Sequence, residues 1–271
     1  MTKRIFWLTD IHLNFLEPEA VGHFLVDVTE QSPDAVLIGG DIGEASSIGR
    51  YLRAIEAAFT CPVFFVLGNH DFYGGSIERV RHAVSEQAAA SEILSYLTAA
   101  GATRQDVAEL APNVGLIGHD GWADGRLGDY ESSTVMLNDY RLIKELAGVD
   151  KARRLPLLNA LGDEAAEHLR ARLPVAFERF EHVLLLTHVP PMREACWHEG
   201  RLSNDEWVPH FACEAVGRML LELMPRFPDR RLTVLCGHTH GRGETQPLAN
   251  LQVLTGAAEY RFPAVEKVFE F

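Results

Sequence analysis

Side chains that commonly bind metal ions occur at five places along the chain, each directly after a short apolar run. Carboxylate oxygens, imidazole nitrogens and one amide oxygen form a donor set that suits Mn²⁺, Fe or Zn²⁺ better than a soft metal. Seven donors are too many for one ion that keeps an open position, so they suit two divalent ions that share a carboxylate. The candidate metal ligands are Asp10, His12, Asp41, Asn69, His188, His238 and His240.

The spacing within these groups has a geometric meaning. Asp10 and His12 are two residues apart, and so are His238 and His240. In an extended chain, residues i and i+2 point to the same side, so each pair can bind one ion or face two adjacent ions. A glycine precedes Asp41, the asparagine of the third group and the first histidine of the last group. These glycines permit sharp turns and a close approach of the backbone.

Short apolar strands would position these side chains. The segments predicted as strands are 4–8, 35–38, 63–67, 114–117, 182–186, 232–236, 251–254 and 265–269. Most show little alternation of apolar and polar residues, which indicates strands buried on both faces. In open α/β sheets, sites form outside the carboxyl ends of parallel strands. The five groups would therefore meet along one edge.

Segments with helical spacing lie between the strands. The predicted helices are 19–31, 48–59, 76–100, 160–172 and 213–224, and Gly101 is a candidate end for the third. Alternation of strand and helix implies a layered α/β fold. The last strands have no helix between them, which indicates a second, partly antiparallel sheet.

The overall charge restricts the partners. The 271 residues include 25 Lys and Arg against 38 Asp and Glu, a formal net charge of −13. Such a surface repels extended nucleic acid and anionic membranes. A small phosphorylated substrate remains compatible, because bound cations would supply local positive charge. The sequence does not indicate an oligomeric state.

Processing and redox signals point to the cytoplasm. The apolar run at 5–8 is too short for a secretory signal, and no run approaches the roughly 18 apolar residues of a membrane span. The four cysteines are scattered without a C-x-x-C pair, which argues against a disulfide framework. We therefore expect a cytoplasmic protein with reduced thiols.

One domain over residues 1–271 is the simplest division, because the chain has no repeat, low-complexity tract or Pro/Gly-rich linker. Segments 118–154 and 190–209 are polar, aromatic and punctuated by Gly and Pro, and we interpret them as insertions that cap the site. The second contains Arg193, Trp197 and His198. These side chains could contact the base, sugar or phosphate of a substrate, or equally cover the flank of the domain.

Taken in order, the five groups resemble the motif blocks of the calcineurin-like metallophosphoesterase superfamily. The blocks read Asp-x-His at 10–12, Gly-Asp at 40–41, Gly-Asn-His-Asp at 68–71, Thr-His at 187–188 and Gly-His-Thr-His at 237–240. They span nearly the whole chain. The resemblance implies a four-layer αββα sandwich, in which two mixed sheets are flanked by helices, and a binuclear centre of Mn²⁺ or Fe, with Zn²⁺ as a further candidate.

The resemblance also implies a role for each motif residue. One metal would be bound by Asp10, His12 and His240, the other by Asn69, His188 and His238, and both by Asp41. His70 would face the substrate as a proton donor or transition-state stabiliser, and Asp71 would orient it. Many members carry Asp or Arg shortly after the bridging aspartate. This chain has Glu44 there instead, which we do not count as a site residue.

The implied reaction is hydrolysis of a small phosphodiester or phosphomonoester by a hydroxide that bridges two metals. Two alternatives stay open: a phosphoprotein phosphatase, and a non-catalytic interaction scaffold on the same fold. A scaffold would usually lack ligands or the histidine at position 70, all of which are present. The net charge disfavours a nuclease, and the ordered blocks disfavour a binuclear amide or ester hydrolase. Monoester and diester hydrolysis share the same metal core, so the substrate is not set by the fold.

Overall fold

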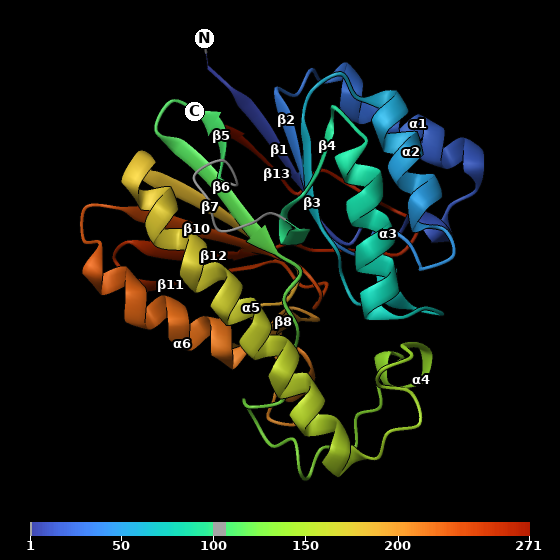
Figure 1. Cartoon of the computed structure of the whole chain (residues 1–271), viewed down its shortest axis with the longest axis vertical. Coiled ribbons are helices and arrows are strands. Elements are labelled where there is room, and N and C mark those ends of the chain that lie inside the picture. Colours follow the sequence, from blue (N-terminus) through green and yellow to red (C-terminus); the bar gives the residue numbers. More distant parts are fainter. Residues whose placement is uncertain (1, 100–106) are drawn as a thin grey trace.

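Two large β-sheets pack face to face between helices in the computed structural model, which describes residues 2–99 and 107–271 (Figure 1). The predicted helix end at Gly101 lies outside the described residues. The helices are α1 (Pro18–Glu30), α2 (Ile48–Ala58), α3 (Ile77–Ala89), α4 (Asp139–Leu142), α5 (Lys151–Arg179) and α6 (Glu214–Leu223). The strands are β1 (Arg4–Leu8), β2 (Ala35–Gly39), β3 (Val63–Val66), β4 (Leu94–Tyr96), β5 (Ala108–Ala111), β6 (Val114–His119), β7 (His182–Thr187), β8 (Trp197–His198), β9 (Arg201–Leu202), β10 (Arg231–Cys236), β11 (Gly243–Leu248), β12 (Leu251–Thr255) and β13 (Lys267–Glu270).

Both large sheets are mixed. The first has the order β13-β1-β2-β3-β4, in which β13 is antiparallel to β1 and the other neighbours are parallel. The second has the order β11-β12-β10-β7-β6-β5, in which the four central strands are parallel and the two edge strands are antiparallel. Strands β8 and β9 form a separate two-stranded hairpin.

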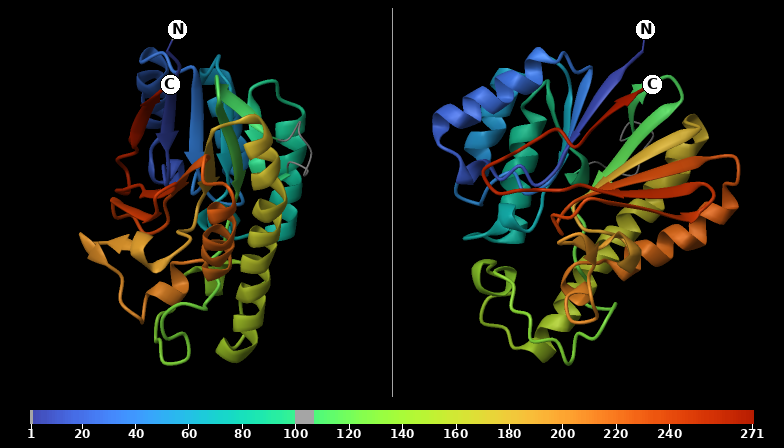
Figure 2. Two further views of the ribbon diagram at one scale, coloured as in Figure 1. Left: turned by 90° about the vertical axis from the view of Figure 1, so that its left-hand side faces the viewer. Right: turned by 180° about the vertical axis from the view of Figure 1, so that it is seen from behind.

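Alternation along the strands produces four layers. On β1, Ile5 and Trp7 join the buried cluster between the two sheets, whereas Phe6 and Leu8 pack against the outer helices. Strand β7 alternates in the same way, with Leu184 in the cluster between the sheets. Helices α1, α2 and α3 cover the first sheet, and α5 and α6 cover the second (Figures 1 and 2). The predicted αββα sandwich is thus confirmed.

The predicted helix 76–100 is wrong in its second half. Helix α3 ends at Ala89, and the chain then enters edge strand β4. The hydroxyl oxygen of Ser91 accepts the backbone N–H groups of Ile93 and Leu94 at 3.1 and 3.0 Å. A serine that bonds its own following backbone offers an alternative to the helix. Of the apolar residues that fit a helical spacing here, Leu94 therefore lies in the strand, Ile93 just before it and Leu97 in the 3-10 turn after it.

Helix α5 is much longer than the predicted helix 160–172. It runs through Pro156 and Pro174, although a proline removes a backbone donor from the helix. Its buried face, which includes Leu169 and Phe177, packs on the second sheet and outweighs that loss. The first predicted insertion, 118–154, therefore ends inside this helix. The predicted last strand 265–269 corresponds to β13, which joins the first sheet rather than the second.

Two cap segments, residues 120–150 and 190–209, gather beyond one end of the sheets. The chain from 120 to 150 and the β8–β9 hairpin both lie in the lower half of each view in Figures 1 and 2. Within residues 2–99 and 107–271, no helix has the length and apolar character to cross a membrane.

Candidate metal centre

The loops after β1 and β2 pair with each other through their backbones. The N–H of Asp10 donates to the carbonyl of Gly40 at 3.0 Å, and the N–H of His12 donates to the carbonyl of Asp41 at 2.8 Å. The N–H of His238 donates to the Asp10 carboxylate at 3.0 Å. The last of these bonds joins residues 228 positions apart in sequence, and together the bonds hold three of the motif groups in place.

Most of the predicted ligands have a strained backbone. Among the described residues, nine that are not glycine have a positive φ, and five of these are predicted ligands: Asp10, His12, Asp41, His238 and His240. Such conformations cost on the order of 1–3 kcal/mol each and cluster at functional sites. The concentration of strain here indicates that the surrounding structure is built to hold these side chains.

Four predicted ligands form a first cluster. One donor atom from each of Asp10, His12, Asp41 and His240 lies within 4.8 Å of every other. Nε2 of His12 lies 3.2 Å from Nε2 of His240 and 3.7 Å from Oδ2 of Asp41. Nε2 of His240 lies 3.5 Å from Oδ1 of Asp10.

The other predicted ligands form a second cluster around the amide oxygen of Asn69. This oxygen lies 3.0 Å from Nε2 of His188 and 2.9 Å from Nδ1 of His238. Nε2 of His188 also lies 3.5 Å from Oδ1 of Asp41. Asp41 therefore directs one carboxylate oxygen toward each cluster, as a bridging carboxylate would.

The chemistry of the donors fits metal ions. Burial lowers the pKa of His12 to about 4, so its ring is neutral at pH 7. Burial alone would raise the pKa of Asp10, but nearby His188, His240 and His12 hold it well below its usual range. Imidazole nitrogens and carboxylate oxygens converge on one point, where a cation satisfies them together. The residues of both clusters thus fit a pair of divalent ions.

Backbone carbonyls fix two of the histidines from behind. Nδ1 of His188 lies 2.9 Å from the carbonyl oxygen of Gly39, and Nε2 of His238 lies 3.0 Å from that of His210. In each ring the nitrogen that bonds the carbonyl carries the proton, so the other nitrogen presents its lone pair to the cluster.

Asp139 and Tyr73 complete the second cluster and were missed by the sequence reasoning. The Asn69 amide N–H donates to the Asp139 carboxylate at 2.8 Å, and the Tyr73 hydroxyl donates to the same oxygen at 2.7 Å. Asp139 lies in α4, within the first predicted insertion. An acidic residue in an irregular loop carries no signal by itself, and its partner lies 70 positions away.

His70 lies beside the first cluster. Its ring centroid is 4.6 Å from that of His12, and its Nε2 is 3.9 Å from Oδ2 of Asp41. The side chain is 15% exposed, so the ring can reach a bound molecule. Its Nδ1 has no hydrogen-bond partner in the described part of the chain.

Asp71, which we expected to orient His70, bonds the backbone of two neighbouring loops. Its buried carboxylate accepts the backbone N–H groups of Ile42, Gly43 and Gly68 at 2.9, 2.7 and 2.9 Å. All three donors belong to the loops that carry Asp41 and Asn69. The carboxylate therefore shapes these loops, because unpaired backbone N–H groups in a buried turn must find an acceptor.

A cavity of about 290 Å³ opens onto both clusters. It is bordered by side chains of the metal centre, of α4 and of the cap, and by one residue from the loop before β13. Its lining is Asp41, Asn69, His70, Tyr73, Leu137, Asn138, Asp139, His198, Trp207, Phe211, His238, Thr239, His240 and Tyr260.

The three predicted substrate contacts separate in the structure. His198 lines this cavity, and its Nδ1 lies 2.9 Å from the carbonyl oxygen of Thr239. Arg193 pairs with the Asp205 carboxylate at 2.6 Å. Trp197 is half-buried and packs so closely on Gly243 that a Cβ there would lie 1.9 Å from its ring.

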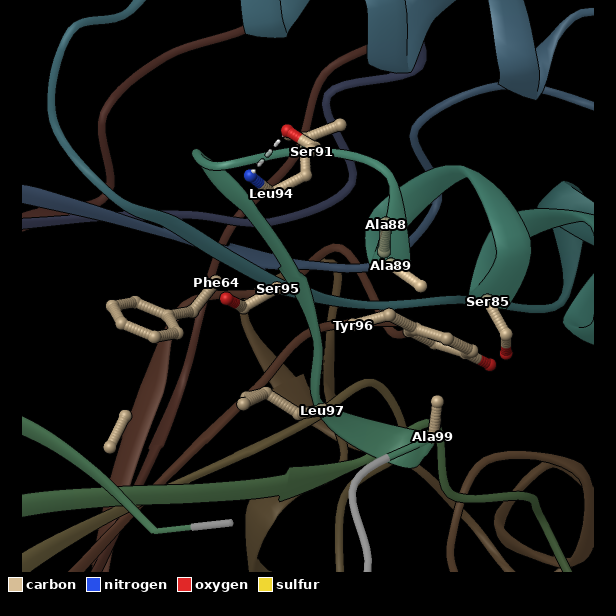
Figure 3. A pocket seen from close by; sticks show the side chains of 11 residues that line it. Phe64, Ser85, Ala88, Ala89, Ser91, Leu94, Ser95, Tyr96, Leu97 and Ala99 are labelled. Atoms are coloured by element: carbon tan, nitrogen blue, oxygen red, sulfur yellow. Dashed lines mark hydrogen bonds between the residues drawn. The ribbon is translucent and has the colours of Figure 1, made fainter. Parts of the chain in front are cut away.

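A second cavity of about 480 Å³ lies between α3 and the edge strand β4 (Figure 3). Its described lining consists of alanine, serine and leucine side chains together with the rings of Phe64 and Tyr96. No residue in that lining is an acid, a histidine or a cysteine, so it offers no metal chemistry.

The two mixed sheets and the two donor clusters agree with what the resemblance to the calcineurin-like metallophosphoesterases implied. Residues 3–242 match the sequence model of the calcineurin-like phosphoesterase family, and the chain belongs to this family.

One named relative shares part of the sequence. The chain is 35% identical over 103 residues to a probable cyclic nucleotide phosphodiesterase of Pseudoalteromonas sp. (strain SM9913). This match covers 31% of the chain and 40% of the relative, so it spans less than half of that protein.

Two solved structures share the fold. The phosphopantetheinyl hydrolase of Mycobacterium tuberculosis has a TM-score of 0.62 at 13% identity, with 99% of this chain and 95% of that chain covered. A dimetal phosphatase of Danio rerio has a TM-score of 0.54 at 15% identity, with 94% and 87% covered.

Proposed function

We propose that the protein is a binuclear metal-dependent phosphoesterase that hydrolyses a small phosphodiester or phosphomonoester. The observation that carries this proposal is the position of Asp41 between the two donor clusters. Its Oδ2 faces His12 of the first cluster, and its Oδ1 faces His188 of the second. The proposed ligands of one ion are Asp10, His12, Asp41 and His240, and those of the other are Asp41, Asn69, His188 and His238.

When bound, a pair of divalent ions lowers the pKa of a water molecule toward neutrality and neutralises charge on the phosphoryl oxygens. Mn²⁺ or Fe suits the donor set best, and Zn²⁺ is a further candidate. Asp139 and the carbonyl of His210 hold the amide and imidazole of the second cluster in place.

His70 is the proposed proton donor to the leaving oxygen. It borders the cavity without belonging to either donor cluster, and an imidazole can donate a proton near neutral pH. Asp71 acts on the reaction indirectly, because its carboxylate holds the backbone of the loops that carry Asp41 and Asn69.

A small phosphodiester is the substrate that we favour. The capped cavity of about 290 Å³ suits a small molecule better than a folded phosphoprotein. The name of the Pseudoalteromonas relative, a cyclic nucleotide phosphodiesterase, points the same way. The net charge of −13 disfavours extended nucleic acid and anionic membranes, and we propose a cytoplasmic location.

Metal content and two chromogenic substrates test the proposal. The protein, purified without chelator and supplied with Mn²⁺, is expected to hold close to two ions and to cleave bis-p-nitrophenyl phosphate. Asp41→Ala is expected to lose metal and activity together. A preference for p-nitrophenyl phosphate would select a phosphomonoesterase. A wild-type protein that binds no metal and cleaves neither ester would refute the proposal in favour of the scaffold alternative.

A further inference from the structure

Trp207 is a large aromatic residue that remains 39% exposed beside the metal centre. Single exposed aromatic residues are ordinary on protein surfaces, so exposure alone indicates nothing. What distinguishes Trp207 is its position between two cavities. It lines the cavity at the metal clusters and also an adjoining cavity of about 390 Å³ under the β8–β9 hairpin.

The indole ring is held in a fixed place from below. It stacks on Phe211 with ring centroids 5.4 Å apart and planes inclined by 30°. Phe211 is 6% exposed and belongs to a small buried cluster with Cys196, Val208 and Ala212. A partly exposed ring that stacks on a buried ring is a rigid stacking surface.

The backbone of Trp207 is fixed as well. The side-chain oxygen of Asn204 accepts the N–H of Glu206 at 3.1 Å and that of Trp207 at 3.2 Å. These bonds fix the backbone that carries the indole and leave the ring free to contact a ligand. The aromatic surface is therefore pre-organised, and little conformational freedom is lost when a ligand stacks on it.

Aromatic contacts lead from Trp207 to the metal centre. Phe211 also meets the ring of the predicted ligand His238 edge-on, with centroids 5.5 Å apart. His198 lies roughly parallel to Trp207, with centroids 6.3 Å apart, and lines both cavities. A molecule with its phosphoryl group at the metals would thus extend along this aromatic wall.

The outer cavity offers polar groups around the aromatic face. Its lining includes Arg201, Ser203 and Asn204 as well as Glu199, which pairs with Arg201 at 3.6 Å. Donors and acceptors at the edge of a flat apolar face match a nucleobase, which has a π-face and a polar edge.

We propose that the exposed face of Trp207 binds a planar aromatic group, of the nucleobase type, carried by the phosphodiester whose phosphoryl group lies at the metal centre. This inference rests on the proposed phosphoesterase function for the position of the phosphoryl group. It assigns to Trp207 the selection of nucleotide-like diesters over diesters of the same charge that lack an aromatic substituent.

Two diesters with the same leaving group test the selection. Thymidine 5′-(p-nitrophenyl phosphate) and methyl p-nitrophenyl phosphate both release p-nitrophenolate, so the ratio of their kcat/KM values reports the other substituent alone. We expect wild type to prefer the thymidine diester. Trp207→Ala should lower the ratio at least about fivefold, since a stacked base contributes this much or more, and Trp207→Phe should keep most of it. Leu221→Ala, which truncates a 44% exposed apolar side chain on α6, should leave the ratio unchanged.

Binding is measured independently of turnover. In calorimetric titrations of the Mn²⁺-loaded protein, thymidine 5′-monophosphate should bind more tightly than inorganic phosphate, and Trp207→Ala should reduce that advantage at least about fivefold. A loss of both affinities in proportion, an unchanged kcat/KM ratio, or equal wild-type affinities for the two phosphates would overturn the inference. If neither diester is cleaved, the protein is not a phosphodiesterase, and the affinity ratio alone decides the role of Trp207.

Discussion

The carboxylate of Asp139 accepts the side-chain N–H of Asn69 at 2.8 Å and thereby turns the Asn69 amide oxygen toward His188 and His238. The same carboxylate oxygen accepts the Tyr73 hydroxyl, so two donors saturate it. The first cap segment therefore contributes directly to the second donor cluster. This contact couples the cap to the metal centre.

Removal of the Asp139 carboxylate should weaken the second metal site selectively. Groups that orient metal ligands typically contribute 10- to 100-fold to metal affinity, so Asp139→Ala should weaken binding of one of two Mn²⁺ ions by about that factor. Asp139→Asn keeps an oxygen acceptor and should lie between Asp139→Ala and wild type. Titration calorimetry measures both sites. Asp229→Ala, which removes an exposed acid, is the control, and equal weakening of both ions in Asp139→Ala would contradict the assignment.

His70 should be needed for turnover but not for metal binding. It borders the cavity, whereas the four atoms of the first cluster and the donors around Asn69 come from other residues. Loss of a general acid typically lowers the rate about 10²- to 10⁴-fold, so His70→Ala should lose that much in kcat for bis-p-nitrophenyl phosphate and keep close to two ions. Metal analysis and steady-state kinetics on the same preparation measure both. Loss of an ion in parallel with activity would make His70 a ligand instead.

The part of the site that could be predicted from the sequence is the part carried by strand ends. The strand 4–8 was predicted with its true bounds, and the strands before Asn69 and His188 were each predicted to within one residue. Buried strands have a run of apolar residues, and a polar residue directly after such a run is conspicuous. The seven donors were therefore visible before the structure, although their convergence depended on the parallel order of the strands.

The residues that could not be predicted belong to irregular segments. Asp139 reaches the cavity because of how the first cap segment folds back, and Tyr260 because of the path of the loop before β13; no periodicity encodes either path. Among the three cap residues that we selected by chemical type, His198 borders the cavity, while Arg193 pairs with Asp205. The type of a residue did not identify a cavity residue when its position relative to the sheet was unknown.

The unfolding free energy should fall as the pH decreases below about 6.5, in part because of His168. Burial, with His119 and Arg172 nearby, lowers the pKa of this imidazole from 6.5 to about 3 in the folded protein. Between these values the unfolded chain takes up a proton that the folded protein does not, so acid favours unfolding in this window and the effect is absent above it.

His168→Gln should therefore reduce the pH dependence of unfolding between pH 3 and 6.5 by up to about one proton. Urea denaturation in the presence of a chelator measures this slope without a contribution from bound metal. His23→Gln replaces an exposed histidine and controls for the substitution itself. An identical slope in wild type and His168→Gln would show that this ring does not oppose protonation.

Gly68 should be required at the metal centre because of the space that it leaves. A Cβ atom at this position would lie 2.1 Å from Oδ1 of Asp41 and 2.7 Å from Cε1 of His188. Both neighbours are buried ligand candidates that cannot move without disturbing the clusters. Gly68→Ala should thus displace the bridging carboxylate, lose at least one of the two ions and lose most activity. Gly22→Ala is the matched control, since no atom lies within 4 Å of a Cβ there and alanine favours helix α1 by roughly 0.5–1 kcal/mol. Circular dichroism should show that both variants keep the wild-type fold, and a Gly68→Ala protein with full metal content and activity would mean that Asp41 does not hold the position argued for it.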